Sequence, residues 1–253
     1  MHVPAFSRLT RPTKEACLLS IAACKSMRQF RQIQALLFRI HLHQDEDALN
    51  KSMVFCTDPS LGNFPYAGRM FSTIRRPNLF VHNVIMKALA NKRMWSEILL
   101  LYGRLKEAGL IPDNFTYPFV LKAIGCLQKV MEAGKVHGYI TKSGADGYAC
   151  KPLMDMYGKF GDVENAVKVF DEMREPDVVS WNILIAVLLR CGRHHDAVEV
   201  FSRLRLEGSL KPDEATFVST LSVCVALKFL EFGKKIHGCI IKELAPTAII
   251  SNA

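Results

Sequence analysis

The sequence predicts an all-α protein, a right-handed α-solenoid of stacked helix-turn-helix repeats. Three observations support this: the chain repeats itself at a spacing of 99–100 residues, its apolar residues follow helical spacing, and no segment alternates apolar and polar residues as a half-buried strand does. One small helical hairpin cannot bury both of its faces, so neighbouring hairpins must stack. We expect the first helices of successive hairpins to line a concave surface and the second helices to form the outer layer.

The long repeat is visible in matching segments. NLFVHNVIM (78–86) returns as DVVSWNILI (177–185), which places Asn83 on Asn182. A Pro-Asp pair recurs 100 residues apart, in each case after a helical segment and a polar turn. Proline cannot continue a helix, so this pair marks a stop at matching places.

Shorter units lie inside this period. Three apolar stripes with relative positions 0, 3, 4 and 7 predict one helix face each: Ile98-Leu101-Tyr102-Leu105, Val163-Ala166-Val167-Phe170 and Ala197-Val200-Phe201-Leu204. The apolar segments that precede them are Val81–Lys92, Pro152–Lys159 and Ser180–Arg190. Gly161 and Gly192 stand where the second and third pairs must turn. The unit is therefore a helical hairpin of 31 to 36 residues, and three unequal units make up the longer period.

Composition excludes several classes of protein. The chain is 49% hydrophobic and 23% charged, which argues against wholesale disorder. Its longest uncharged apolar stretch, Val178–Leu189, is well short of the roughly 20 residues that a membrane-spanning helix needs, so no membrane partner is expected. The eight cysteines form no CxxC pair, which argues against a zinc site or a thioredoxin-type motif and favours reduced intracellular thiols.

Positive charge is concentrated near the N-terminus. Residues 1–43 hold seven Lys or Arg and one acidic residue, whereas the remaining 210 residues hold 26 and 23. The net charge of +9 allows a polyanionic partner but does not by itself establish one.

Three runs resemble a known family: WNILIAVLLRCGRHHDAVEVFSRLRLEG, VLKAIGC…GKVHGYITKSG and LMDMYGKFGDVENAVKVFDEM. They are similar to pentatricopeptide repeats of the plant PLS subclass, in which standard, longer and shorter motifs alternate. The resemblance implies a solenoid over 17–253 with repeats at 17–45, 46–78, 79–113, 114–146, 147–177, 178–213 and 214–247, and a partial repeat at 248–253. The break inside a repeat leads us to expect a chain truncated before any E or DYW domain.

The resemblance also implies that each repeat reads one base of single-stranded RNA through its fifth and last residues. Asn83 with Asp113, and Asn182 with Asp213, match the family's uridine-reading pair. An Asn amide both donates and accepts hydrogen bonds, so it suits the Watson–Crick edge of a pyrimidine. The matching residues expected to sandwich the base are Phe80 and Val179.

The other repeats match less well. Asn50 with Asn78 resembles a less selective pyrimidine reader, although Asp47 stands at its sandwich position. Lys151 with Asp177 fits no well-established pair, and Pro118 and Val218 offer no side-chain hydrogen bond at the fifth position of the long repeats. The expected RNA target is pyrimidine, uridine, two unspecified bases and uridine, read 5′ to 3′ along the chain.

Simpler interpretations accompany these assignments. An Asn in the first turn of a helix is often only a cap, and Pro-Asp is an ordinary helix stop. His137 and His237 fall on second helices, where packing or an outer-surface role is favoured over metal binding. No metal, cofactor or catalytic residue is expected, because the sequence has no HxE with PCxxC, no Walker loop and no GxSxG.

The predicted function is sequence-selective binding of single-stranded organellar RNA, supporting RNA editing or other processing through an enzyme that acts in trans. Residues 1–16 are basic and contain Ser and Thr, which resembles a short transit peptide for a mitochondrion or chloroplast. Two alternatives remain open. One is a helical scaffold for protein or peptide partners, although the tetratricopeptide signature of Trp, Leu-Gly and Tyr is absent. The other is an editing enzyme whose C-terminal domain follows Ala253.

Overall fold

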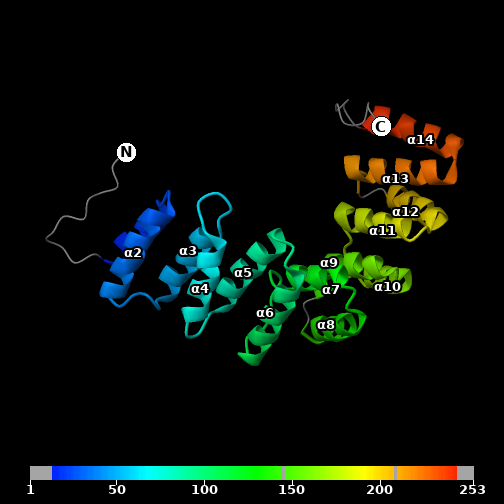
Figure 1. Cartoon of the computed structure of the whole chain (residues 1–253). Coiled ribbons are helices and arrows are strands. Elements are labelled where there is room, and N and C mark those ends of the chain that lie inside the picture. Colours follow the sequence, from blue (N-terminus) through cyan, green and yellow to red (C-terminus); the bar gives the residue numbers. More distant parts are fainter. Residues whose placement is uncertain (1–12, 144–145, 208–209, 244–253) are drawn as a thin grey trace. The chain divides into compact units, whose positions relative to one another are not determined.

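The computed structural model describes residues 13–143, 146–207 and 210–243, and these residues form fourteen α-helices and no β-strand (Figure 1). The prediction of an all-α helical-repeat fold is therefore confirmed. The helices are α1 (Lys14–Ala22), α2 (Met27–Arg39), α3 (Glu46–Thr57), α4 (Phe64–Thr73), α5 (Leu79–Asn91), α6 (Trp95–Glu107), α7 (Tyr117–Cys126), α8 (Val130–Ser143), α9 (Asp146–Phe160), α10 (Val163–Asp171), α11 (Val178–Arg190), α12 (His194–Glu207), α13 (Glu214–Leu227) and α14 (Leu230–Glu243).

The chain divides into two compact units, Met1–Phe119 and Val120–Ala253. In the first unit α3 packs against both α1 and α5, and in the second unit α11 packs against both α9 and α13. Each of these is the first helix of a hairpin, so first helices stack on first helices within a unit. Second helices also contact the first helix of the next hairpin, as α4 does with α5 and α12 does with α13.

The core consists of apolar side chains at helical spacing. The predicted stripe on α6 is buried throughout, and so is the one on α12. On α10 the stripe differs from the prediction, because Val167 is only half-buried and Val169 is buried in addition to Val163, Ala166 and Phe170. Three first helices bury a ring at their fourth residue: His82 in α5, Trp181 in α11 and Phe217 in α13.

Helix α9 begins six residues before the predicted segment Pro152–Lys159 and contains Pro152 in its interior. Proline is disfavoured inside a helix because it lacks the N–H that an interior position donates. In α9, Ala149 precedes the proline and is fully buried, as is Met154 after it. Packing on both sides of Pro152 therefore outweighs the unfavourable helix propensity of proline.

Turns between helices follow the expected chemistry. Gly161 and Gly192 adopt φ angles of 76° and 74°, the left-handed conformation that commonly ends a helix. At the N-terminal end, α1 begins at Lys14 and not at 17, because the Thr13 side chain caps it by accepting from the backbone N–H of Ala16.

Two sequence predictions fall largely or wholly outside the described residues. Residues 1–12 of the expected transit peptide are not described, and neither is the expected partial repeat at 248–253. Each of the seven expected repeat ranges holds two of the helices, except that α1 and α9 start slightly early. Within the described part of the chain, no helix is both long enough and apolar enough to cross a membrane.

Candidate nucleic-acid interface

The predicted uridine-reading pairs form the same contact in two separate places. Asn83, the fifth residue of α5, donates a hydrogen bond from Nδ2 to Asp113 Oδ1 at 3.0 Å. Asn182, the fifth residue of α11, donates from Nδ2 to Asp213 Oδ1 at 2.9 Å. Each contact joins one first helix to the segment that begins the next first helix. The structure thus brings together the members of both pairs, while their role in reading a base stays a prediction.

The second member of each pair also accepts a backbone N–H at or just before the start of the next first helix. Its side-chain oxygen accepts the backbone N–H three residues further on, which is the usual capping contact. The four contacts are Asn78 with Val81 N (2.9 Å), Asp113 with Thr116 N (2.9 Å), Asp177 with Ser180 N (2.9 Å) and Asp213 with Thr216 N (2.8 Å). Asn78, Asp177 and Asp213 are the N-cap residues of α5, α11 and α13, and capping was the simpler interpretation of Asn83 and Asn182. It is wrong for Asn83 and Asn182, since Asn78 and Asp177 cap those helices.

A third side chain, which the sequence analysis missed, completes both networks. Thr116 Oγ1 donates to Asn83 Oδ1 at 2.8 Å, and Thr216 Oγ1 donates to Asn182 Oδ1 at 2.6 Å. Both threonines are 0% exposed. A signal for them exists in the sequence, because PDNFT (112–116) and PDEAT (212–216) place a threonine three residues after the aspartate in both copies.

Hydrogen bonding favours the ionised form of Asp213 and of Asp177. Burial would raise the pKa of Asp213, but hydrogen bonds from the Thr216 N–H and from Asn182 outweigh it and hold the pKa below its ordinary value. Asp177 behaves similarly. Burial would raise its pKa, but hydrogen bonds from Lys151 and Ser180 outweigh this effect and lower the pKa to about 2. Both carboxylates are therefore acceptors at neutral pH.

Apolar side chains stand exposed beside the two networks. Phe80, three residues before Asn83, is 49% exposed, and Val179, three residues before Asn182, is 51% exposed. Phe115, which follows Asp113 by two residues, is 66% exposed and was not singled out from the sequence. It is the second residue of its own repeat, which was the available signal. Exposed apolar faces beside a polar network are suited to stacking on a base.

The pair Asn50 and Asn78 is arranged the other way round. Asn78 donates from Nδ2 to Asn50 Oδ1 at 3.1 Å, so Asn50 acts as an acceptor within the pair. Asp47, at the expected sandwich position, forms an ion pair with Lys14 Nζ at 2.7 Å. This position therefore has a charged pair where the Asn83 and Asn182 sites have an exposed apolar side chain.

Lys151 takes the place of the asparagine in the remaining short repeat. Its Nζ lies 2.6 Å from Asp177 Oδ2, and both side chains are partly exposed. Pro118 and Val218 occupy the corresponding positions on α7 and α13. Neither carries a polar group, so they cannot form a side-chain hydrogen bond to a base.

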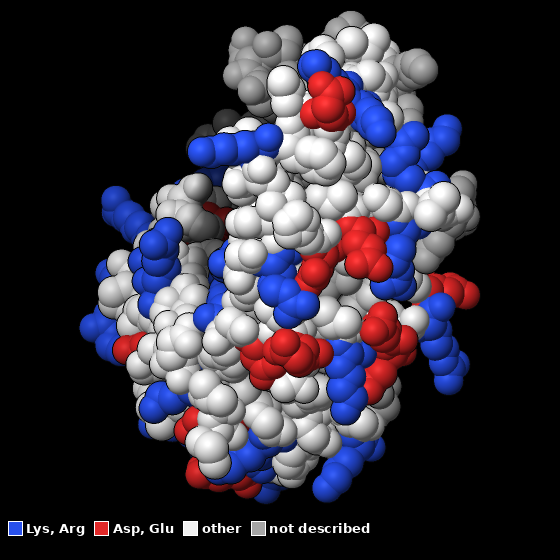
Figure 2. All heavy atoms as spheres, turned by 90° about the vertical axis from the view of Figure 1, so that its right-hand side faces the viewer, with Lys and Arg blue, Asp and Glu red and all other residues white. Residues whose placement is uncertain are grey.

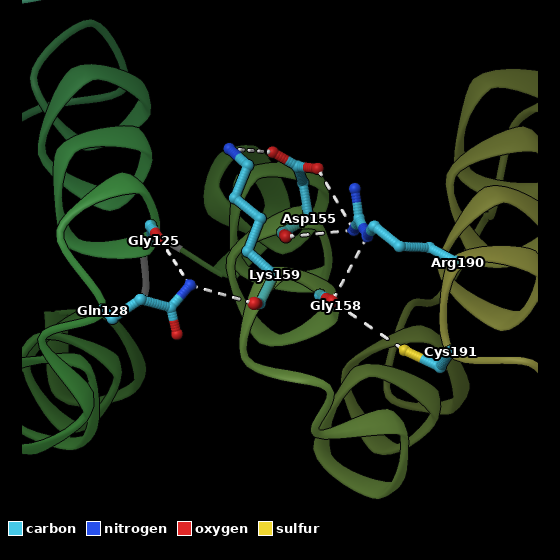
Figure 3. Close-up of polar contacts among 7 residues, drawn as sticks. All are labelled: Gly125, Gln128, Asp155, Gly158, Lys159, Arg190 and Cys191. Carbon is cyan, nitrogen blue, oxygen red and sulfur yellow. Dashed lines mark hydrogen bonds and ion pairs between the residues drawn. The ribbon is translucent and has the colours of Figure 1, made fainter.

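The opposite ends of the first helices in the second unit are joined by a separate polar network (Figure 3). Arg190 Nε donates to the Gly158 carbonyl at 3.2 Å, and Gln128 Nε2 donates to the Lys159 carbonyl at 3.0 Å. These contacts satisfy carbonyl groups near the C-terminal end of α9 and link it to α7 and α11. Their role is to hold neighbouring hairpins together.

His137 and the surface charge are the remaining polar features of the described residues. His137 Nδ1 forms a hydrogen bond with Tyr157 Oη at 2.7 Å, which joins α8 to α9. In the described residues, no three His, Cys, Asp or Glu side chains are grouped to hold a metal ion. Figure 2 shows Lys and Arg side chains lying among Asp and Glu on one face of the molecule.

Comparison with known proteins places these features in context. Residues 176–226 match the PPR repeat family, and residues 80–110 and 149–178 match the PPR repeat. A chloroplastic pentatricopeptide repeat-containing protein of Arabidopsis thaliana is 33% identical over 87% of this chain and 37% of its own length. A second Arabidopsis thaliana pentatricopeptide repeat-containing protein is 33% identical over 93% of this chain and 41% of its own. The chain thus spans only about two fifths of the length of these relatives.

A solved structure shares the fold. The crystal structure of the pentatricopeptide repeat protein PPR10 in complex with an 18-nt psaJ RNA element matches with a TM-score of 0.51. The match covers 94% of this chain and 42% of PPR10 at 14% sequence identity. At this identity the similarity concerns the fold alone.

Proposed function

Because this chain carries pentatricopeptide repeats, we propose that it binds single-stranded RNA and selects bases through the Asn/Asp pairs of its first helices. The observation that carries this proposal is the recurrence of one network, Asn with Asp and a buried Thr, at two equivalent places with an exposed apolar residue beside each. The fold similarity to PPR10, whose structure was solved with RNA, supports the same conclusion.

The chemistry of the network fits a uracil edge. Asn83 uses one amide proton on Asp113 and one oxygen lone pair on Thr116, so one donor and one acceptor remain. Uracil presents carbonyl oxygens next to an imino N–H, which needs one donor and one acceptor from the protein. Phe80 can cover the face of the same base, with stacking worth about 1–3 kcal/mol.

We propose further that the bound RNA is organellar and that the chain directs an editing or processing enzyme that acts in trans. Two considerations support this extension. Several relatives are named chloroplastic or chloroplastic/mitochondrial. The alternation of longer and shorter repeats along the chain also resembles the PLS subclass.

Uridine selectivity is the test of the proposal. The full chain is titrated into a labelled RNA with uridines at the two expected places, and into the same RNA with purines there, while fluorescence anisotropy is recorded. We expect each purine to weaken binding by about 5- to 100-fold, the usual effect of losing a base-specific contact. Equal binding to both RNAs, or none, would contradict the proposal and favour a scaffold for protein partners.

A matched pair of variants assigns the effect to the site. Asn83→Ala removes the reading amide, and Asn91→Ala makes the same change at the other end of α5, where the side chain is exposed. We expect Asn83→Ala to abolish the preference for uridine at the corresponding base and Asn91→Ala to retain it.

A further inference from the structure

We propose that Thr116 and Thr216 are positioning residues that fix the amide orientation of Asn83 and Asn182 and thereby determine which pyrimidine each site prefers. The inference rests on the proposed RNA binding. It adds a specificity role for two side chains that cannot touch the RNA themselves, since both are 0% exposed.

The neighbours of Asn83 fix the orientation of its side-chain amide. Rotating an Asn side chain by half a turn exchanges its donor and its acceptor, so an unconstrained Asn serves uracil and cytosine equally well. A carboxylate only accepts hydrogen bonds, so Asn83 must direct its NH2 group toward Asp113 Oδ1. Its Oδ1 atom then faces the Thr116 hydroxyl, 2.8 Å away.

The Thr116 hydroxyl group has a single proton to donate. Thr116 Oγ1 accepts the backbone N–H of Asp113 at 3.2 Å and has two acceptors in reach of its proton, Asn83 Oδ1 and Asp113 Oδ1, each at 2.8 Å. Asp113 Oδ1 already receives the Asn83 amide and the backbone N–H groups of Phe115 and Thr116. The proton therefore goes to Asn83 Oδ1, which has no other donor among the protein contacts described.

The Asn182 site is arranged in the same way. Thr216 Oγ1 accepts the backbone N–H of Asp213 at 3.1 Å and lies 2.6 Å from Asn182 Oδ1. Asp213 Oδ1 already receives the Asn182 amide and the Thr216 N–H. Each amide is thus held from both ends, and the donor and acceptor left for the base keep a fixed order.

Two other positions in the chain, at Lys151 and at Asn50, lack this arrangement and serve as internal comparisons. Ser180 Oγ donates to Asp177 Oδ1 at 2.8 Å, but Lys151 stands in place of the asparagine and has no acceptor to receive a hydroxyl proton.

At Asn50 there is no hydroxyl, because Val81 occupies the place of the threonine. Asn78 Oδ1 accepts the Val81 N–H, which leaves its NH2 group for Glu46 Oε1 and Asn50 Oδ1. The Asn50 amide is therefore turned the opposite way, with its oxygen toward its partner.

The first experiment compares uridine with cytidine at the base that faces repeat 79–113. Thr116→Val removes the hydroxyl with little change of shape, and Thr116→Ser restores it. We expect Thr116→Val to lower the uridine-to-cytidine preference about 5- to 10-fold, the value of one hydrogen bond. Thr116→Ser should keep the preference, and the preference at the Asn182 site should not change in either variant.

A purely structural threonine would behave differently. It would lower the thermal midpoint and weaken binding of both RNAs equally, and the unchanged ratio would overturn the inference. A wild-type chain that does not prefer uridine over purine would instead contradict the proposed function itself, so the two failures are distinguishable.

A gain of selectivity provides the second experiment. Lys151→Asn places an asparagine opposite Asp177 with the Ser180 hydroxyl already in position. We expect this variant to acquire a uridine preference at the base that faces repeat 147–177, and Lys151→Asn combined with Ser180→Ala to lack it. Equal preference in the single and double variants would show that the hydroxyl is dispensable and would overturn the inference.

Discussion

His82 is buried in a place where two other first helices, α11 and α13, carry a large ring without an ionisable group. It is the fourth residue of α5, as Trp181 is of α11 and Phe217 is of α13. The side chain is 2% exposed and packs edge-on against Phe71, with its Nδ1 atom 2.9 Å from the Asn78 carbonyl oxygen. Burial lowers the pKa of His82, although the contact with Asn78 opposes the shift.

This lowered pKa predicts acid sensitivity of the first unit. Above about pH 6.5, His82 is neutral in both the folded and the unfolded chain, so its contribution to stability is fully present. As the pH falls below 6.5 the unfolded chain binds a proton first, and stability is lost until the pH reaches the lower folded pKa. The measurement is the free energy of unfolding of the full chain by denaturant titration across this range.

His82→Phe should flatten that dependence, because phenylalanine keeps the ring and cannot bind a proton. The Asn78 carbonyl retains a partner in the backbone N–H of residue 82. His195→Gln, at an exposed position on α12, is the control and should retain the wild-type dependence. Parallel curves for the wild type and His82→Phe would show that another group causes the acid sensitivity.

At the scale of single elements, the first helices of the second unit approach each other closely at glycine. A Cβ atom added at Gly158 in α9 would lie 2.5 Å from Val187 Cγ2 in α11 and 2.4 Å from Arg190 Nη2. Gly158 also supplies the carbonyl group that Arg190 Nε binds (Figure 3). Glycine is therefore required here by the separation of the two helices.

Gly158→Ala should destabilise the second unit by about 1–3 kcal/mol, because Val187 is buried and stiff and cannot move aside without strain. Gly134→Ala is the matched control, since an added Cβ on α8 meets nothing within 4 Å. That variant should be neutral or more stable by roughly 0.5–1 kcal/mol, the usual gain for alanine over glycine in a helix. Equal denaturation midpoints for the two variants would show that α9 and α11 can separate at little cost.

At the scale of the whole molecule, charge and base reading should contribute separately to RNA binding. The chain carries 33 Lys and Arg against 24 Asp and Glu, and Figure 2 shows both signs interspersed on one face. Phosphate contacts from basic side chains raise affinity without regard to sequence. The side chains proposed to read the base, Asn83 and Asn182, carry no charge.

Salt should therefore weaken binding without altering selectivity. Each phosphate contact contributes about 0.7 to the slope of log affinity against log salt for single strands. We expect uridine and purine RNAs to lose affinity in parallel between about 50 and 200 mM salt, with a constant ratio. If the ratio fell toward one as salt rose, selectivity would depend on exposed ion pairs, such as Lys151 with Asp177, and not on the asparagines.

Much of this organisation could be predicted from the sequence because it is encoded locally. Helical periodicity identified the all-α class. The family resemblance, together with the recurrence of Asn83 at Asn182 and of one Pro-Asp pair at the next, predicted the two Asn/Asp pairs that the structure brings into contact. Errors arose where packing decided the outcome. On α10, packing buries Val169 and leaves Val167 half-buried, and α9 begins at Asp146 although the apolar pattern marked only Pro152–Lys159.

What only the tertiary structure decided is the contact geometry between repeats. Thr116 and Thr216 are as visible in the sequence as the aspartates, but their hydroxyl groups matter only because stacking brings them to an asparagine more than 30 residues away. The orientation of each amide follows from which neighbours donate and which accept, and Asn50 is turned the opposite way from Asn83 although the residue type is the same. The sequence thus determined which residues occupy the two sites. The packing of one hairpin on the next determined which atoms of Asn83 and Asn182 stay free to bind a base, because the direction of a hydrogen bond depends on the neighbouring residue as well as on the asparagine itself.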